Sequence, residues 1–299
     1  MQDYNAGSIT VLEGLEAVRV RPGMYIGGVG VKGLNHLIYE IMDNSIDEHL
    51  AGFCKNIWVT LNADGSCTVK DDGRGIPVEM HQKGISAERV VLSTLHAGGK
   101  FDNESYKTSG GLHGVGSSVV NALSNFLDIK ISRDGYIHHD RYEKGIPTVE
   151  LKKGLLPTIG KTRNTGTEIT FLPDDTIFEV TKFKADWLKS RMHESAYLNP
   201  GLILHFTNLR ENEHEETVFH EPEGIVAYVK ELNKGKEVMH APILYKGICD
   251  NIDVEIAIQF VDAFEENIYP GGRYTYCRFQ DKVYRTYKYL CQRTWCIKG

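Results

Sequence analysis

Metal-site and disulfide signatures are missing from this sequence. Its six cysteines include no Cys-x-x-Cys pair, and none stands at the spacing from a histidine that a zinc site uses. A composition of 41% hydrophobic and 25% charged residues, with nine prolines, is ordinary for a globular protein. These features exclude the common zinc modules, a disulfide scaffold, a disordered chain and a collagenous one.

Long apolar runs are also missing. No stretch approaches the ~20 apolar residues that a membrane-spanning helix needs. Asp3, Glu13 and Glu16 are scattered near the N-terminus, so no basic segment followed by an apolar one directs secretion. We therefore expect a cytoplasmic location and no membrane partner.

Positive charge is scarce except near the C-terminus. The net charge of -6 argues against a chain that wraps nucleic acid by itself, because such binding depends on basic contacts to phosphates. Residues 271–299, however, hold seven lysines and arginines against one acid, Asp281. This last segment therefore needs an explanation of its own.

The length of 299 residues predicts two domains, or one large domain with an appendage. Hydrophobic periodicity and turn residues predict a mixed α/β first domain that ends near residue 219. The expected helices cover 10–21, 33–50, 86–95, 115–123, 182–195 and 222–234. The expected strands cover 57–61, 66–70, 126–132, 136–143, 147–152, 167–172, 201–207 and 254–261.

Two common nucleotide-binding motifs do not fit. The segment before Lys100 lacks the first glycine of a P-loop, and Phe101 stands where that motif needs Ser or Thr. Gly111, Gly114 and Gly116 run in the order Gly-x-x-Gly-x-Gly, which is not the dinucleotide-binding order. Any phosphate binding here uses another geometry.

One polar stripe lies along the predicted helix 33–50. Glu40, Asp43, Asn44 and Asp47 are spaced i, i+3, i+4 and i+7, which puts them on one side of that helix. A plain solvated face is the simpler alternative. Asn44 argues against it, because asparagine is an indifferent helix former. A positioned glutamate and an asparagine one turn later suit a water-activating base and an oxygen ligand for Mg²⁺.

A second constellation is the run D-D-G-R-G-I-P at 71–77, where a hairpin strand ends. A simple turn is the alternative. Acids followed by glycines also let a carboxylate accept from an exocyclic amine while the backbone approaches a flat ligand closely. A carboxylate there would select adenine over guanine, because the 6-oxo group of guanine would face another acceptor.

Glycines are dense across residues 97–114. The runs L-H-A-G-G-K-F and G-G-L-H-G-V-G end directly before a predicted helix. Backbone N–H groups in such a turn, together with the helix dipole, can hold an anion. A mobile surface loop is the alternative.

Together these motifs resemble those of the GHKL ATPases. The sequence carries, in the family's order, E-x-x-D-N-x-x-D at 40–47, D-D-G-R-G-I-P at 71–77, L-H-A-G-G-K-F at 95–101, G-G-L-H-G-V-G at 110–116 and T-G-T at 165–167. With R-P-G-M-Y-I-G at 21–27, residues 1 to about 269 are similar to the ATPase region of the DNA gyrase B proteins, which belong to the type IIA topoisomerases. The corresponding protein of topoisomerase IV is the alternative, and E-N-I-Y at 266–269 favours gyrase.

This resemblance implies a fold and a domain division. The fold is an α/β (α+β) two-layer sandwich with a mixed sheet, known as the Bergerat fold. It would occupy residues 1–218, with an N-terminal dimerisation arm at 1–9. Residues 219–269 would begin a ribosomal-S5-like transducer domain, which the chain leaves incomplete.

The resemblance also implies residue roles for ATP and Mg²⁺. Glu40 would be the general base for the attacking water, steered by His36, and Asn44 would be the Mg²⁺ ligand. Asp71 would read the adenine amino group. The nucleotide-contacting set would be Asn44, Asp71, Gly75, Ile76, Pro77, Lys100, Tyr106, Gly110, Gly111, Leu112, His113, Gly114, Val115, Gly116, Thr167 and, from the arm, Tyr4. Asp43, Asp47, Asp72 and Arg74 would support the pocket.

The implied partners belong to a larger assembly. The arm, including Tyr4 and Ile9, would reach a second copy of the chain and close over its nucleotide. A gyrase A-type protein would bind through a C-terminal region that this chain lacks, and DNA would be engaged only indirectly. Two functions remain open: ATP hydrolysis that times a DNA gate, and ATP binding without turnover. The second stays open because the family takes a phosphate-contacting lysine from the later transducer, and nothing before residue 269 supplies it.

The segment 270–299 departs from the family. It gathers three of the six cysteines and five of the fifteen tyrosines and has no amphipathic period. A basic DNA-contacting extension is the simpler explanation. However, codons for R-Y-T-Y-C-R-F-Q-D-K-V-Y can be chosen so that another frame reads GGTHIAGFKTKF and then TELINTYARELGVLK, which is family-like. We therefore expect an out-of-frame tail after a deletion that is not divisible by three.

The gene sequence tests this expectation. Codons for 270–299 should yield the family-like peptide in another frame. Because an out-of-frame tail was not selected to pack, removing it should leave the midpoint of urea unfolding unchanged. Codons that give no such peptide, or a tail whose removal lowers that midpoint, would contradict the expectation.

Overall fold

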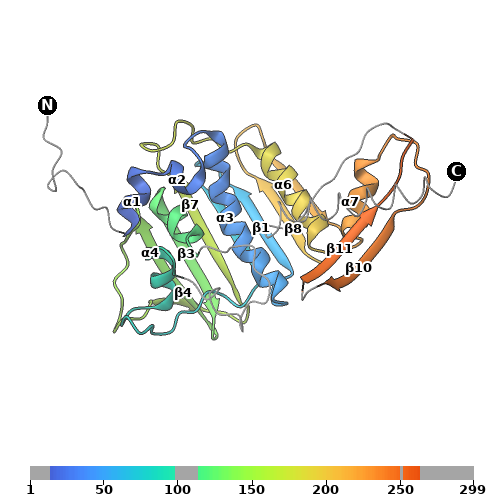
Figure 1. Cartoon of the computed structure of the whole chain (residues 1–299). Helices are drawn as coiled ribbons and strands as arrows, with labels where there is room; N and C mark the ends of the chain where they lie inside the picture. The colour runs from blue at the N-terminus through green and yellow to red at the C-terminus, as the bar shows by residue number, and fades with distance from the viewer. Residues whose placement is uncertain (1–13, 98–113, 250–251, 263–299) are drawn as a thin grey trace, which may run out of the picture. The chain divides into compact units, whose positions relative to one another are not determined.

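The structure, a computed structural model, describes residues 14–97, 114–249 and 252–262. The chain divides after Gly224 into two compact units. Within the described residues, no helix is long and apolar enough to cross a membrane. Figure 1 shows the helices and strands with their labels.

The first unit is built on one mixed sheet. Its strands are β1 (Asn56–Leu61), β2 (Cys67–Asp71), β3 (Ser124–Arg133), β4 (Tyr136–Glu143), β5 (Ile146–Pro147), β6 (Thr158–Lys161), β7 (Gly166–Pro173), β8 (Ile203–Asn208) and β9 (Glu215–His220). They run in the order β5-β4-β3-β7-β2-β1-β8-β9, with β6 also paired to β4. The pair β1 and β8 is parallel and the other pairs are antiparallel. The expected mixed sheet is confirmed.

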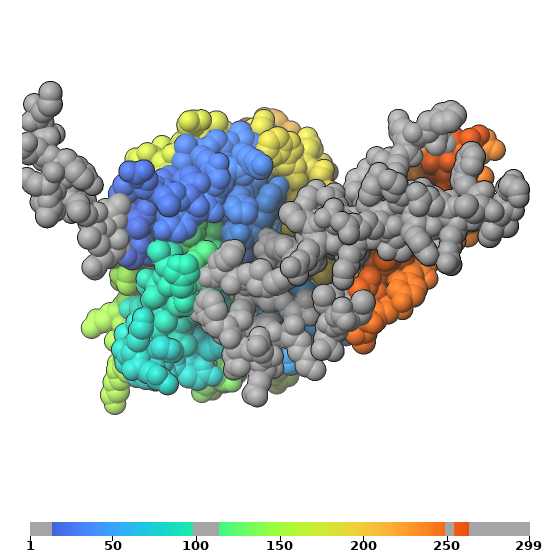
Figure 2. Space-filling view, viewed as in Figure 1, coloured from blue at the N-terminus to red at the C-terminus, as the bar shows by residue number. Residues whose placement is uncertain are grey.

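Helices cover one face of this sheet (Figure 1). They are α1 (Gly14–Val20), α2 (Gly23–Ile26), α3 (Val31–Leu50), α4 (Ala87–Ser93), α5 (Gly116–Ala122) and α6 (Ala185–Leu198). On the same side, Figure 2 shows α1–α3 in blue and α4 in blue-green at the surface. The result is a two-layer α/β sandwich, as the sequence predicted.

The core lies between the two layers. Strand β1 alternates half-buried and buried residues, which is the pattern of a strand with one covered face. Ile57 and Val59 point into the core, and Leu34, Leu37 and Ile38 of α3 are fully buried there. Burial of these side chains is the main force that holds α3 on the sheet.

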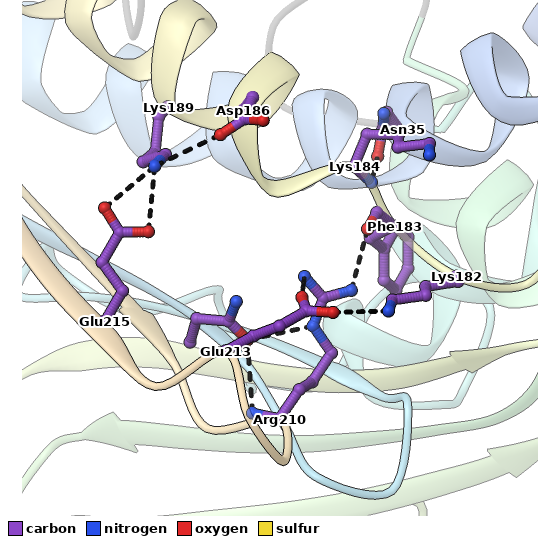
Figure 3. Close-up of polar contacts among 10 residues, drawn as sticks. Asn35, Lys182, Phe183, Lys184, Asp186, Lys189, Arg210, Glu213 and Glu215 are labelled. Carbon is purple, nitrogen blue, oxygen red and sulfur yellow. Dashed lines mark hydrogen bonds and ion pairs between the residues drawn. The ribbon is translucent and has the colours of Figure 1, made fainter.

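Polar contacts join α6 to the sheet edge and to α3 (Figure 3). Lys189 of α6 donates to both carboxylate oxygens of Glu215 on β9, at 2.9 Å each. Arg210, after β8, donates to the Phe183 carbonyl at 2.8 Å. The backbone N–H of Lys184 donates to Oδ1 of Asn35 on α3 at 3.2 Å. The N-terminal end of α6 is therefore fixed by groups from three other segments.

An acidic cluster is buried between α4 and β4. Glu88 and Asp140 are both fully buried. Arg89 binds both oxygens of Asp140 at 2.8–2.9 Å, whereas Glu88 accepts from the Tyr142 hydroxyl at 2.9 Å. Burial, and then the nearby Asp140 charge, raise the pKa of Glu88 well above its ordinary range. The raised pKa favours the neutral, protonated form of Glu88.

The second unit holds one helix and one hairpin among its described residues. Helix α7 spans Ile225–Leu232, and strands β10 (Ile243–Cys249) and β11 (Ile252–Ile258) pair antiparallel. Large apolar side chains of the hairpin are exposed, among them Ile243, Tyr245 and Ile248. That these residues begin a transducer domain stays a prediction.

Several element predictions need correction. The strand expected at 147–152 is only the two-residue β5, Ile146–Pro147, and its continuation does not pair as a strand. Strands β6, β9 and β10 were missed. The short β6 and β10 are defined by their pairing rather than by a period of their own, and β9 begins with charged residues. The helix expected at 86–95 is α4, Ala87–Ser93, and the hydroxyl of the preceding Ser86 donates to the Val78 carbonyl at 3.3 Å.

The buried acid gives a prediction about stability. A carboxyl whose pKa is raised by folding stabilises the folded state fully below its unfolded pKa of ~4.3, and that contribution is lost as the pH rises. Glu88→Gln, which mimics the neutral acid, should therefore remove part of the fall in unfolding free energy between pH 5 and 8.5, by ~1 kcal/mol or more. Urea unfolding at both pH values measures the difference.

The exposed Glu143 of β4 provides the control. Glu143→Gln should leave the pH dependence unchanged. If Glu88→Gln shows the same pH dependence as the parent chain, Glu88 is not held neutral in the folded protein.

Candidate functional site

Asp71, the last residue of β2, is a buried carboxylate at the centre of the sheet, only 7% exposed. Its Oδ1 accepts from the backbone N–H groups of Gly73 at 2.9 Å and Thr167 at 3.2 Å, and its Oδ2 accepts from the Ser45 hydroxyl at 2.9 Å. Burial raises the pKa of Asp71, and these hydrogen bonds oppose that rise. A carboxylate so held can accept a further hydrogen bond at Oδ2.

Backbone segments approach each other closely beside Asp71. A Cβ on Gly166 would collide with the Asp71 carbonyl oxygen, so only glycine lets β7 lie there. Gly75 has φ +77°, which favours glycine, and its carbonyl accepts from Arg133 at 2.8 Å. The Ile76 N–H donates to the Thr167 hydroxyl at 3.2 Å. The T-G-T and D-D-G-R-G-I-P motifs therefore lie side by side and form one wall of the candidate site.

Glu40 lies on α3, with His36 one turn before it. Nε2 of His36 is 3.1 Å from Oε1 of Glu40, a contact that can orient this carboxylate as the resemblance implied. A Cβ on Gly116 would collide with Oε2 of Glu40, so the first turn of α5 packs directly against this carboxylate. The structure thus brings together the helix stripe and the end of the glycine-rich segment.

Asn44 is the next polar residue on the same side of α3. Its Nδ2 donates to the hydroxyl of Ser117 on α5 at 3.0 Å, which assigns the amide orientation, so Oδ1 is the acceptor atom of this side chain. Mg²⁺ in nucleotide sites takes one or two protein oxygens together with phosphate oxygens and water. Asn44 fits that role. No group of three or more potential metal-binding side chains occurs among the described residues.

The residues expected to support the pocket are packed into its frame. Asp43 and Asp47 are 7% and 0% exposed, so the stripe on α3 is not a solvated face. Asp72 accepts from the N–H groups of Lys55 and Asn56 at 2.7 and 2.9 Å, on the β1 side of the strand.

Arg74 forms a two-pronged contact with Glu48. Its Nε and Nη2 donate to the two carboxylate oxygens at 2.9 and 2.8 Å, and its guanidinium lies 3.9 Å from the Phe53 ring centre. The loop after β2 is therefore tied to the C-terminal end of α3.

Part of the predicted site lies outside the described residues: Tyr4, Lys100, Tyr106, Gly110, Gly111, Leu112 and His113. Gly114, Val115 and Gly116 are described and lead into α5. Pro77 is exposed at the end of its motif, and Ile76 packs partly on the core.

Sequence reasoning missed four residues that shape the site: Ser45, Glu48, Ser117 and Arg133. Ser45 and Glu48 extend the polar spacing on α3, which was the one available signal. Ser117 and Arg133 act through partners distant in sequence, which no local pattern reveals.

A cavity of about 290 Å³ also borders Asp71, lined by Trp58, Lys70, Asp71, Asp72, Asn164 and Thr165. Trp58 and Lys70 alternate with the buried residues of β1 and β2, so this cavity opens on the sheet face opposite α3. It is separate from Glu40 and Asn44.

Comparison with known proteins gives consistent matches. The family model described as histidine kinase-, DNA gyrase B-, and HSP90-like ATPase matches residues 30–177. The DNA gyrase B protein of Archaeoglobus fulgidus is 48% identical over 266 residues, which are 89% of this chain and 42% of that protein. The B protein of DNA topoisomerase 4 from Enterococcus faecalis is 49% identical over 267 residues, 89% of this chain and 38% of that protein.

A solved structure is similar as well. It is the 43K ATPase domain of Thermus thermophilus gyrase B in complex with an aminocoumarin. The TM-score is 0.72 at 37% identity, over 83% of this chain and 62% of that one. The chain spans about two fifths of the length of the curated relatives that it matches.

The environment of Asp71 gives a prediction about base selectivity. Asp71→Asn can turn an amide donor towards the purine amino group, and a mispaired buried group costs roughly 1 to 3 kcal/mol. We expect the parent chain to prefer ATP to GTP and the variant to bind ATP more weakly, by calorimetric titration. Asp175→Asn, at an exposed position, is the control. Equal affinity of the parent chain for ATP and GTP would refute the adenine assignment.

Proposed function

The chain belongs to the histidine kinase-, DNA gyrase B- and HSP90-like ATPases, and from this premise we propose that it binds and hydrolyses ATP as the ATPase region of a gyrase B-like type II topoisomerase protein. One observation carries the proposal. Helix α3 contacts the buried Asp71 carboxylate at the end of β2 through Ser45, and the same helix carries the oriented Glu40–His36 pair that packs against the start of α5.

Base recognition falls to Asp71 and its neighbours. The amino group of adenine donates to Oδ2 of Asp71, which has a lone pair left after the bond from Ser45. The glycines at 75 and 166 let the backbone come close to a flat ring. Guanine is disfavoured, since its 6-oxo group meets an acceptor.

Glu40 acts as the general base. It takes a proton from the water that attacks the terminal phosphate, and the contact with His36 holds its carboxylate towards that water. Asn44 would hold Mg²⁺ through Oδ1, and the bound ion would neutralise charge on the phosphate oxygens. The hydrogen bond from Nδ2 of Asn44 to the Ser117 hydroxyl keeps that oxygen in place.

The phosphates would lie at the start of α5. Gly114, with φ +58°, precedes this helix, and Gly116 opens it. Because these two glycines carry no side chain, a phosphate can come close to their backbone N–H groups. Phosphoryl transfer depends mainly on positioning and electrostatic stabilisation, which this arrangement offers. Lys100, Tyr106 and the glycine lid at 110–113 would complete the phosphate contacts.

The larger assembly is part of the same proposal. A second copy of the chain would contribute its arm, including Tyr4, over the nucleotide. A gyrase A-type protein would join through sequence that the longer relatives have, and DNA would be handled by that complete enzyme. Relatives of both the gyrase and topoisomerase IV kind match at similar identity, so the gyrase choice rests on residues 266–269.

ATP binding without turnover is the second candidate. It is favoured by the family resemblance, which implies that a phosphate-contacting lysine comes from a later transducer segment. Phosphate release by the purified chain under saturating ATP distinguishes the two functions, because both require ATP to bind and only one yields product.

Substitutions on α3 should separate binding from hydrolysis. If the chain hydrolyses ATP, Glu40→Gln should keep ATP binding and lower the rate of hydrolysis by ~10²-fold or more, since the general base is lost. Asn44→Ala should weaken both, because metal and phosphates bind together. Calorimetry and phosphate release measure the two effects, and Glu150→Gln, at an exposed position, is the control. Hydrolysis that persists in Glu40→Gln would exclude Glu40 as the base.

A further inference from the structure

We propose that Ser45 is a positioning residue for base recognition, and that its hydroxyl orients the Asp71 carboxylate so that Oδ2 faces the exocyclic amine of the purine. This inference rests on the proposed adenine nucleotide binding. It adds a residue that the motifs do not specify, since Ser45 occupies an unspecified position within the E-x-x-D-N-x-x-D run on α3.

The hydrogen bonds of Asp71 define what remains for a ligand. An ionised carboxylate offers about four acceptor positions, two on each oxygen. The N–H groups of Gly73 and Thr167 occupy Oδ1, and the Ser45 hydroxyl occupies one position of Oδ2. One position on Oδ2 is therefore left, and its direction is set by the bond from Ser45.

The three donors come from three separate segments. Gly73 belongs to the loop after β2, Thr167 to β7 and Ser45 to α3. Both backbone donors hold the same oxygen, so the carboxylate can still tilt about that oxygen. Ser45 is the donor that holds the other oxygen, and it does so from a helix that is fixed by the core.

The hydroxyl of Ser45 behaves differently from those of other buried helical serines. Serine within a helix commonly donates back to a carbonyl of its own helix. Ser118 does so to Val115 at 2.9 Å, and Ser195 does so to Arg191 at 2.9 Å. Ser45, only 3% exposed, instead donates across to Asp71 of the sheet. Its hydroxyl therefore binds a carboxylate of the candidate site and not a carbonyl of its own helix.

A purine nucleotide without the 6-amino group distinguishes the loss of Asp71 orientation from a general disturbance of the nucleotide site. If Ser45 orients Asp71 for that amine, Ser45→Ala should weaken ATP binding by roughly tenfold, the effect of losing one hydrogen bond to a charged group. Binding of purine riboside triphosphate, which lacks the amine, should change by about twofold or less. Calorimetric titration of the full chain with both nucleotides measures the two effects.

Two further variants complete the experiment. Ser195→Ala removes a buried helical hydroxyl far along the chain and should affect neither nucleotide. In the Asp71→Asn background, adding Ser45→Ala should cause no further selective loss of ATP binding, because both changes act through one carboxylate.

The outcomes are distinct. Selective loss of ATP binding in Ser45→Ala supports the inference. Equal weakening of both nucleotides assigns Ser45 a purely structural role, and unchanged ATP binding removes it from recognition, so either result overturns the inference. A parent chain that binds neither nucleotide would instead refute the proposed function itself.

Discussion

The burial of Asp71 is the constraint on which the site depends. A carboxylate that is 7% exposed is costly unless its oxygens are hydrogen-bonded, and no single segment here supplies enough donors. Donors arrive from α3, from the loop after β2 and from β7. Meeting this requirement brings those three segments together, and the glycine at 166 permits the close approach. The same arrangement leaves one acceptor position for a ligand.

Helix α3 combines structure and chemistry on one element. Its apolar side chains, such as Leu37 and Ile38, fix it on the sheet, while Glu40 and Asn44 face α5. A helix held by its core gives the side chains proposed for catalysis little freedom, which electrostatic and general-base catalysis require. The contacts of His36 to Glu40 and of Ser117 to Asn44 remove much of the remaining side-chain freedom.

Local patterns predicted the helices and central strands well. The period of α3 and the residue types of the strands expected at 57–61 and 66–70 are local signals, and these elements formed where expected. Edge strands were predicted less well, since β6 is short and takes its identity from pairing with β4. In the site, motif residues such as Asp71 and Thr167 met as expected. Ser45 and Arg133 were missed because their partners lie far away in sequence.

The sequence by itself determined the order of the motifs, the α/β pattern and the residue types available for nucleotide chemistry. These features depend on composition and on the spacing of residues that are close together in the sequence. Only the tertiary structure decided that Asp43 and Asp47 are buried, that burial beside Asp140 raises the pKa of Glu88, and that Ser45 donates to Asp71 rather than to its own helix. Burial and long-range hydrogen bonds arise when segments from different parts of the chain pack together, because only then is each polar group removed from water and given its partner.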